Sequence, residues 1–341
     1  MDQRFGLEDS LFWSKPHQND LALMRATRDA HFSGVRVDAP TFIPIDTRTT
    51  CPLLVQRCGP ERDLWAVDFS RHGLVVLSST DTRVVRAEFA LDQDFADPEE
   101  PVDPADAPDG YGSQAHLVEL RELLSLPWNP ARYATFVVMR EHRSNAVLLH
   151  LGRSGSAFDD PEVEAFLERE RAKASPGLIH PPLGRPVPTY KRLDVSPPIP
   201  DEPGIALTVE RVVALKPGAQ CLVRGSFRLP VLPQERVTGR YEGHCPEGDP
   251  TALLSISLLV TGGDRATPTV LPLAIPTFDP LDRQAARPIA TGYFCFDLLS
   301  FAAMSHDVQT YFVYAIAGEF VTGPAPAALV SPDSLETPRR G

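Results

Sequence analysis

Proline is the residue that most limits what this chain can form. It occurs 35 times in 341 residues, roughly twice its usual frequency. Inside a helix, a proline removes a backbone hydrogen bond and clashes with the preceding turn. Strand ends and turns accommodate proline much better. The composition therefore opposes a mainly helical fold and predicts many short strands joined by turns.

Segments rich in β-branched and aromatic residues recur at short intervals and are bounded by turn-forming residues. Several of them alternate polar and apolar residues, as in ALTVERV at 206–212, which is typical of a half-buried antiparallel strand. HLVELRELL at 116–124 fits either a strand or a helix. We predict strands at 41–46, 51–56, 63–69, 73–79, 82–91, 134–142, 145–152, 205–215, 220–229, 252–262, 269–278, 290–299 and 309–320.

Two segments favour helices. Residues 19–32 have an incomplete apolar face, with Asn19 or Asp20 as the cap. Residues 159–173 have Asp160 at the N-cap and Pro161 at the first helical position. Residues 176–203 are too rich in proline for a regular element and predict an extended connector.

These elements predict a mainly β protein with two tandem antiparallel β-sandwich domains, Ig-like or jelly-roll-like. The strands do not alternate with regular helices, which argues against a βαβ fold. We expect an N-terminal helical extension at 1–33, sandwiches at 34–152 and 204–331, a helix and connector at 153–203, and a tail at 332–341.

The two predicted domains share a sequence echo. ELLSLPWNPARYATFVV at 122–138 aligns without a gap to DLLSFAAMSHDVQTYFV, 175 positions later, so that Glu122 falls on Asp297 and Thr135 on Thr310. Cys51 and Cys221 also precede similar apolar runs, 170 positions apart. The two matches predict an internal duplication. The alternative is that any two β domains share such a strand–turn–strand pattern by chance, and it stays open.

The charge of the chain bears on its partners. A net charge of -12 and a pI near 5.2 disfavour nucleic-acid binding, which needs a basic surface. Residues 92–110 carry eight acids and no basic residue. We interpret this stretch as a solvated loop. A calcium site or a dock for a basic partner are the alternatives, although the stretch lacks the ligand register of an EF-hand.

The sequence also predicts a compartment. The first residues lack a basic region followed by an apolar core, and no run of about 18 apolar residues occurs, so we expect neither a secretory signal nor membrane insertion. The odd set of five cysteines contains no CxxC pair, which favours free thiols. Arginine exceeds lysine severalfold, as in proteins from GC-rich genomes. We expect a cytoplasmic protein of bacterial type.

Motifs for chemistry are sparse. We find no HxxxH pair, no GxxxxGK[ST] loop and no GxSxG elbow. His244 beside Cys245 is the most ligand-like pair, but it lacks two further ligands nearby and makes only a weak metal candidate. We therefore predict no catalytic residue, no metal and no cofactor.

Aromatic residues in turn-like segments and in the connector suggest binding instead. Trp128, Tyr190 and Tyr241, with Arg132 and Arg240, have the residue types that form interface centres. The favoured hypothesis is a non-enzymatic protein that binds a protein partner or associates with itself through paired sandwiches. The alternative is an enzyme or enzyme-accessory protein whose site, with or without a metal, is assembled at the interdomain cleft.

Overall fold

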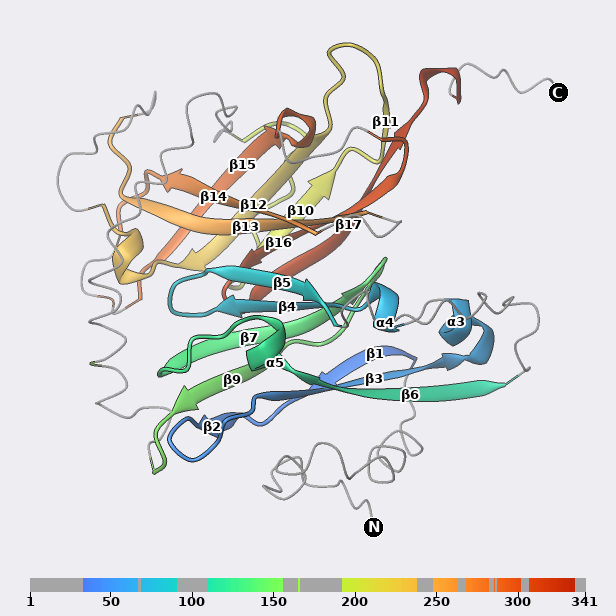
Figure 1. Ribbon diagram of the computed structural model, residues 1–341. Coiled ribbons are helices and arrows are strands. Elements are labelled where there is room, and N and C mark those ends of the chain that lie inside the picture. Colours follow the sequence, from blue (N-terminus) through green and yellow to red (C-terminus); the bar gives the residue numbers. More distant parts are fainter. Residues whose placement is uncertain are drawn as a thin grey trace. The chain divides into compact units, whose positions relative to one another are not determined.

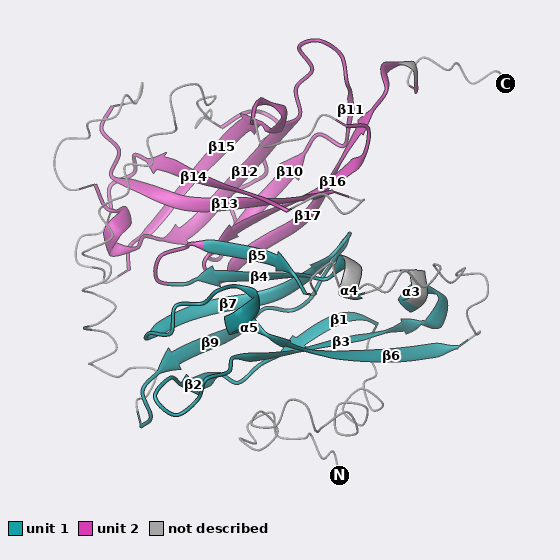
Figure 2. Cartoon of the chain, in the orientation of Figure 1, with its two compact units in different colours: residues 1–80, 85–167 teal, residues 81–84, 168–341 magenta. Residues whose placement is uncertain are grey.

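Two compact units make up the chain. The computed structural model describes residues 33–66, 69–90, 110–155, 165, 192–237, 248–262, 268–281, 285, 287–301 and 307–334 (Figure 1). Unit 1 comprises residues 1–80 and 85–167, and unit 2 comprises residues 81–84 and 168–341 (Figure 2).

Unit 1 contains two sheets. The first has the order β1 (Gly34–Asp38), β3 (Pro52–Pro60), β6 (Tyr111–Glu119), and all its pairs are antiparallel. The second has the order β2 (Phe42–Pro44), β9 (Val147–Gly152), β7 (Ala131–Met139), β4 (Leu74–Ser79), β5 (Val85–Phe89), and β8 (His142–Arg143) also pairs with β7. Only the β2–β9 pair of this sheet is parallel among the described strands.

The two sheets of unit 1 face each other across one apolar core. Strands β1, β3 and β6 contribute Val37, Leu53 and Val118, while β4 and β7 contribute Val75 and Val137, all buried. Alternation along each strand brings every second side chain into this core. Unit 1 is therefore a β-sandwich, as the sequence predicts.

Unit 2 is built the same way. One sheet has the order β10 (Gly204–Val209), β12 (Leu222–Pro230), β15 (Ile289–Asp297). The other has the order β11 (Val212–Ala214), β17 (Phe320–Val330), β16 (Thr310–Ala317), β13 (Ala252–Gly262), β14 (Thr269–Thr277). Its core includes Val223, Phe227, Ile256 and Val313, so unit 2 is a second sandwich.

The strand orders of the two units correspond one to one, and the register agrees as well. Pro52 pairs with Glu119 in unit 1, and Leu222 pairs with Asp297 in unit 2. The corresponding residues are 170 positions apart in β3 and β12 and 178 apart in β6 and β15. The pairs β2–β9 and β11–β17 are both parallel. An internal duplication as the origin of this likeness stays a prediction.

The gapless alignment at an offset of 175 is wrong in register. In the sheets, Glu119 and not Glu122 corresponds to Asp297. The difference of three is odd, so the 175 offset moves every side chain to the opposite face of its strand. It places the core residue Val137 on Phe312, which is not in the core cluster, whereas an offset of 178 places Val137 on the core residue Ala315.

One predicted strand is a pair of short helices. The described residues of this segment, 63–66 and 69, lie in α3 (Glu61–Ala66) and at the start of α4 (Phe69–His72). The apolar residues of DLWAVDF resemble a strand, but Pro60 ends β3, and Glu61 and Asp63 then lie in the first turn of α3, where acids favour a helix.

Other segments subdivide differently from the prediction. The ambiguous segment 116–124 divides into the end of β6 and the short helix α5 (Leu120–Leu123). Residues 205–215 contain both β10 and β11, and most of β17 was not predicted. Three short 3-10 turns complete the described elements: η3 (Pro233–Glu235), η4 (Leu298–Ser300) and η5 (Pro332–Ser334). The predicted helices at 19–32 and 159–173 lie outside the described residues, apart from residue 165.

Candidate functional site

The outer strands of the sheets are the first place to look for a binding site, because an outer strand presents unpaired backbone groups. Among the described residues, eight strands lie at the ends of the four sheet orders, and six of these are protected. β2 and β11 have three residues each, β1 and β5 carry charges of both signs, β14 contains two prolines, and β10 lies beside β17 of the facing sheet. Strands β6 and β15 remain, each nine residues long and free of proline, lysine and arginine.

Hydrogen bonding at the two ends of β6 defines which backbone groups point outward. The Leu120 N–H donates to the Cys51 carbonyl at 2.9 Å, and the Glu61 N–H donates to the Gly110 carbonyl at 3.1 Å. Antiparallel pairing alternates hydrogen-bonded and non-hydrogen-bonded residues. The backbone groups of Ser113, Ala115 and Leu117 therefore point away from β3, and no described strand lies on that side.

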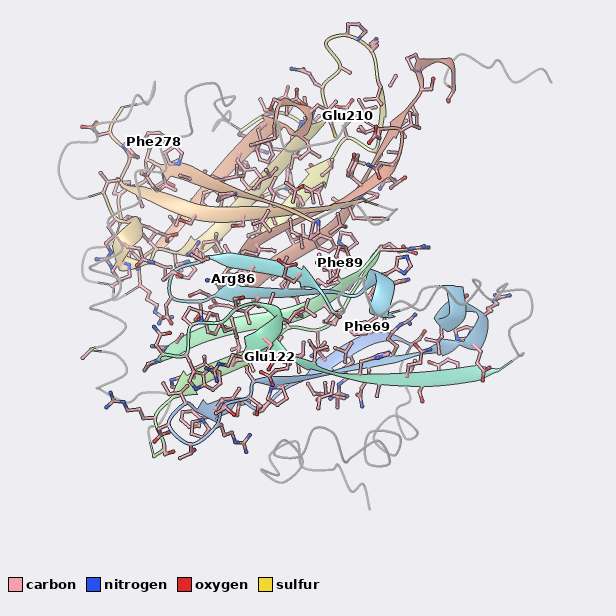
Figure 3. The ribbon with its side chains drawn as sticks, viewed as in Figure 1. Phe69, Arg86, Phe89, Glu122, Glu210 and Phe278 are labelled. Atoms are coloured by element: carbon pink, nitrogen blue, oxygen red, sulfur yellow. The ribbon has the colours of Figure 1, made fainter. Side chains whose placement is uncertain are left out.

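A carboxylate holds the end of β6 in place. Glu119 Oε1 accepts hydrogen bonds from the Cys51 N–H at 2.6 Å and the Arg121 N–H at 3.1 Å. The side chain thus joins the start of β3 to the first turn of α5, the short helix that contains Glu122 (Figure 3). Burial raises the pKa of Glu119, against the lowering effect of these two backbone donors.

Unit 2 has the same arrangement at the end of β15. Asp297 Oδ1 accepts from the Cys221 N–H at 2.8 Å and from the Leu299 N–H at 3.1 Å. The Leu298 N–H donates to the Cys221 carbonyl at 2.8 Å, as Leu120 does to Cys51. By the same alternation, Thr291, Tyr293 and Cys295 direct their backbone groups away from β12.

The inner face of β6 is braced by side chains of its own unit. Arg57, which is buried, donates through Nη1 to Gln114 Oε1 at 2.9 Å. The ring of Phe69, labelled in Figure 3, stacks on His116 with 4.6 Å between the centroids. These contacts brace the strand from its inner side.

The outer face of the β15 sheet is covered by the chain's own connector. We call residues 192–203 the strap. Ser226 Oγ donates to the Pro198 carbonyl at 2.6 Å, and Arg228 Nε donates to the Pro200 carbonyl at 2.9 Å. The Arg192 guanidinium lies 6.0 Å from the centre of the Tyr293 ring. The strap therefore crosses from β15 over β12 before the chain enters β10.

Both outer strands begin with an exposed apolar side chain. Tyr111 at the start of β6 is 57% exposed, and the corresponding Ile289 of β15 is 44% exposed. Ser113 is also exposed, whereas Cys295 of β15 is buried.

The described cysteines are free and buried: Cys51, Cys58, Cys221 and Cys295. Burial raises the pKa of the Cys221 thiol to about 12 and raises the pKa of Cys51 further. Because the thiolate is the reactive form, these two thiols are poor nucleophiles. Both cysteines contribute to the structure through their backbone N–H groups, which donate to Glu119 and Asp297.

Unit 2 also contains a buried ion pair. Arg83 Nε lies 3.3 Å from Glu235 Oε1, with 2% and 3% of the two side chains exposed. Glu235 also accepts from the N–H groups of Leu232 and Ser255 at 2.9 and 2.8 Å. Burial raises the pKa of Glu235 and lowers the pKa of Arg83, and the ion pair opposes both shifts. The pair fixes residues 81–84 within unit 2.

Trp128 is anchored within unit 1. Its indole N–H donates to the carbonyls of Ile45 and Arg48 at 3.0 and 3.2 Å, and the Arg121 guanidinium lies 4.4 Å over the ring. Arg132 lies on β7, opposite His150 of β9. Neither Arg132 nor Trp128 therefore belongs to β6, the strand with the free edge. Their role in binding stays a prediction.

The remaining predicted site residues, Tyr190, Arg240, Tyr241, His244 and Cys245, lie outside the described residues. Within the part of the chain that the structure describes, no group of three His, Cys, Asp or Glu side chains is placed to hold a metal ion. Every described helix is too short or too polar to cross a bilayer.

Sequence reasoning did not single out β6. The signal was present in YGSQAHLVE, a nine-residue run with no proline and no charge before its final glutamate. Whether such a strand is an outer one depends on strand pairing, which one strand's composition does not reveal.

Comparisons with known proteins give no assignment. No family model matches the chain, and no curated protein matches it. One similar solved chain comes from a structure titled "Structural basis of neurohormone perception by the receptor tyrosine kinase Torso". It is 7% identical, the match covers 91% of this chain and 81% of that one, and the TM-score of 0.18 is too low to support a common fold.

Proposed function

We propose that this chain is a non-enzymatic protein that binds a protein partner or assembles with itself, and that it does so by strand addition at an open sheet edge. The observation that carries the proposal is the state of the outer strands. Six are short, charged, interrupted by proline or flanked, while β6 and β15 are nine residues long and contain no proline, lysine or arginine. Natural proteins commonly blunt such edges, so a long unblunted edge favours a binding role.

The geometry of β6 supports strand addition in particular. Ser113, Ala115 and Leu117 each offer one outward N–H and one outward C=O, as alternation requires. Main-chain hydrogen bonds from these groups supply affinity in strand addition, and alternating side chains supply specificity. Because both ends of β6 are fixed, little ordering of the strand would be required on binding.

We also propose a reducing, cytoplasmic setting for this activity. The four described cysteines are free and buried, which fits a compartment in which thiols stay reduced.

Proline substitution tests the function directly. Ser113→Pro and Thr291→Pro remove one outward N–H from each open edge, and neither N–H belongs to the ladder with the neighbouring strand. The control carries Ser113→Ala and Thr291→Ala, which remove the same side chains and keep both N–H groups. Association is measured by light scattering and by affinity capture from the native lysate.

We expect the wild type and the alanine control to associate equally, and the double proline variant to associate about tenfold less, equivalent to about 1.4 kcal/mol. Circular dichroism checks that the proline variant is folded. A folded proline variant that associates like the wild type would contradict the proposal. So would a wild-type chain that stays monomeric and captures nothing.

A further inference from the structure

The strap is a surface element of unit 2 that does not belong to its hydrophobic core. Every residue from 192 to 203 is exposed or only partly buried, and Val195 is 61% exposed. The core cluster of unit 2 includes no strap residue, and among the described strands none pairs with the strap. Release of the strap would therefore leave the apolar packing of the sandwich in place.

The sheet holds the strap by its backbone. Ser226 Oγ donates to the Pro198 carbonyl at 2.6 Å, and Arg228 Nε donates to the Pro200 carbonyl at 2.9 Å. The two donors are two residues apart on β12, which is about 6.6 Å along a strand. Two residues of a polyproline II segment span about 6.2 Å, so an extended segment presents alternate carbonyls to both donors. Proline favours this extended form and lowers the cost of ordering the segment.

The sheet leaves room for the strap over β12. Ser226 pairs with Ala206 of β10 on one side and with Tyr293 of β15 on the other, and Arg228 pairs with Gly204 of β10. A Cβ added to Gly204 would meet no side chain within 4 Å, apart from those of its neighbours in the chain. A small residue on a strand permits close approach of another backbone. The outer face is thus shaped for a flat, extended segment.

Unit 1 lacks this pair of donors. Gly34 pairs with Cys58 as Gly204 pairs with Arg228, so the offset of 170 places Gln56 on Ser226 and Cys58 on Arg228. A thiol is only a weak donor, whereas a guanidinium carries several N–H groups. Because unit 1 forms the same strand order without these two side chains, the sandwich does not require them, and their presence in unit 2 favours a binding role.

We propose that the outer face of the β10–β12–β15 sheet is a binding site for an extended, proline-rich segment, and that the strap of a second copy of the chain fills it when the resident strap is released. A second copy carries the same carbonyls, so an exchange of straps keeps both hydrogen bonds. The resident strap competes as a tethered ligand, with an effective concentration of about 1 mM. This inference goes beyond the proposed function, because it uses a sheet face and not an open edge.

Two complementary variants test the inference in the full chain. The donor-deficient variant carries Ser226→Ala and Arg228→Met and keeps its strap. The strap-deficient variant keeps both donors, and a flexible glycine–serine segment of twice the length replaces its residues 196–200. A third variant carries both sets of changes. The matched control, Thr208→Ala, removes a hydroxyl of the same face that donates to the Arg224 carbonyl and not to the strap.

Sedimentation velocity measures association of each variant and of equimolar mixtures. The donor-deficient and strap-deficient variants should form a one-to-one complex at least about tenfold tighter than either forms with itself, because the free strap of one meets the free donors of the other. Thr208→Ala in place of the donor-deficient variant should give no such gain, since its strap stays on its own sheet. Association that all variants share belongs to the open edges.

Two results would overturn the inference. One is the absence of any additional complex when the two folded variants are mixed. The other is a complex that persists when the strap-deficient variant is mixed with the variant that carries both sets of changes, because that mixture contains no intact strap.

Should a variant not fold, the isotopically labelled wild type decides the question. An unlabelled peptide of residues 192–203, added to several times about 1 mM, should displace the resident strap and shift the amide resonances of Val195 and Ile199. Unshifted resonances at that concentration would contradict the inference.

Discussion

Replacing Glu119 by alanine should destabilise unit 1 by roughly 2 to 4 kcal/mol, because the carboxylate satisfies two backbone donors at once. The Cys51 N–H is buried, and an unsatisfied buried donor costs about 1–3 kcal/mol. Loss of the cap on α5 adds about 1 kcal/mol. Glu119→Gln keeps an acceptor oxygen in place and should cost about 1 kcal/mol or less.

Urea denaturation followed by tryptophan fluorescence measures this effect in unit 1. Trp128, which is anchored within unit 1, reports on that unit through its emission. The matched variant in unit 2 is Asp297→Ala, followed by far-UV circular dichroism, with a loss of similar size. The reasoning would be refuted if Glu119→Ala changed the unfolding free energy by less than about 0.5 kcal/mol, or if glutamine were as damaging as alanine.

The same carboxyl predicts a pH dependence. Burial raises the pKa of folded Glu119 above its ordinary value of 4.5, so between these two values the folded state holds more protons than the unfolded state. This group therefore lowers the unfolding free energy as the pH rises from 4.5 through the raised pKa. The Glu119→Gln variant should lack that decrease, and a wild-type curve parallel to that of the variant would contradict it.

Three further substitutions follow from the packing. Gly225→Ala places a Cβ 2.0 Å from the Phe294 ring and should destabilise unit 2 by about 1–3 kcal/mol in urea denaturation; an unchanged midpoint would mean that the ring relaxes freely. Arg83→Met leaves Glu235 buried without its counter-charge and should cost about 3–5 kcal/mol, with a smaller loss when Glu235→Gln is added; equal losses would argue against the ion pair. Trp128→Phe removes the indole N–H and should cost unit 1 about 1 kcal/mol in thermal unfolding, whereas no loss would mean that the Ile45 and Arg48 carbonyls find other donors.

Periodicity and composition were sufficient to predict the class of fold. The β-branched and aromatic runs that contain β3, β4, β7, β12 and β13 were recognisable because each packs on a sandwich core. Cys51 and Cys221 were correctly seen as corresponding, since both directly precede the middle strand of a three-stranded sheet.

Register was harder to predict, because it depends on turn lengths. Corresponding residues lie 170 apart in β3 and β12 but 178 apart in β6 and β15, so no single offset describes both halves. The leucine pairs at 123–124 and 298–299 favoured an alignment with an offset of 175. The feature that recurs in the structure is a carboxylate at the end of the outer strand, Glu119 in β6 and Asp297 in β15.

Strand β17 was missed beyond residue 320 because it contains Pro324 and Pro326. A proline lacks the N–H that a two-sided ladder needs, which argues for an outer strand. β17 nevertheless lies between β11 and β16, and the pairing explains how. β11 pairs only with Ala328–Val330, so both prolines lie beyond the part of β17 that β11 covers.

The sequence predicted only part of the candidate site. The sequence predicted binding through the paired sandwiches, but the residues singled out were aromatic residues such as Trp128, whose indole donates hydrogen bonds within its own unit. A free edge is a property of backbone groups with nothing beside them. Side-chain type alone does not reveal it, because the same alternating sequence can occupy a central or an outer strand.

Residue-resolved amide hydrogen exchange of β6 and β15, in the monomeric and in the associated chain, tests the central claim most directly. In the free chain, Gln114, His116 and Val118 should be protected by pairing with β3, while Ser113, Ala115 and Leu117 should exchange rapidly. Association should slow exchange at these outward amides of β6, at the outward amides of Thr291, Tyr293 and Cys295 in β15, or at both. Unaltered exchange at the outward amides of both strands in the associated chain would contradict strand addition.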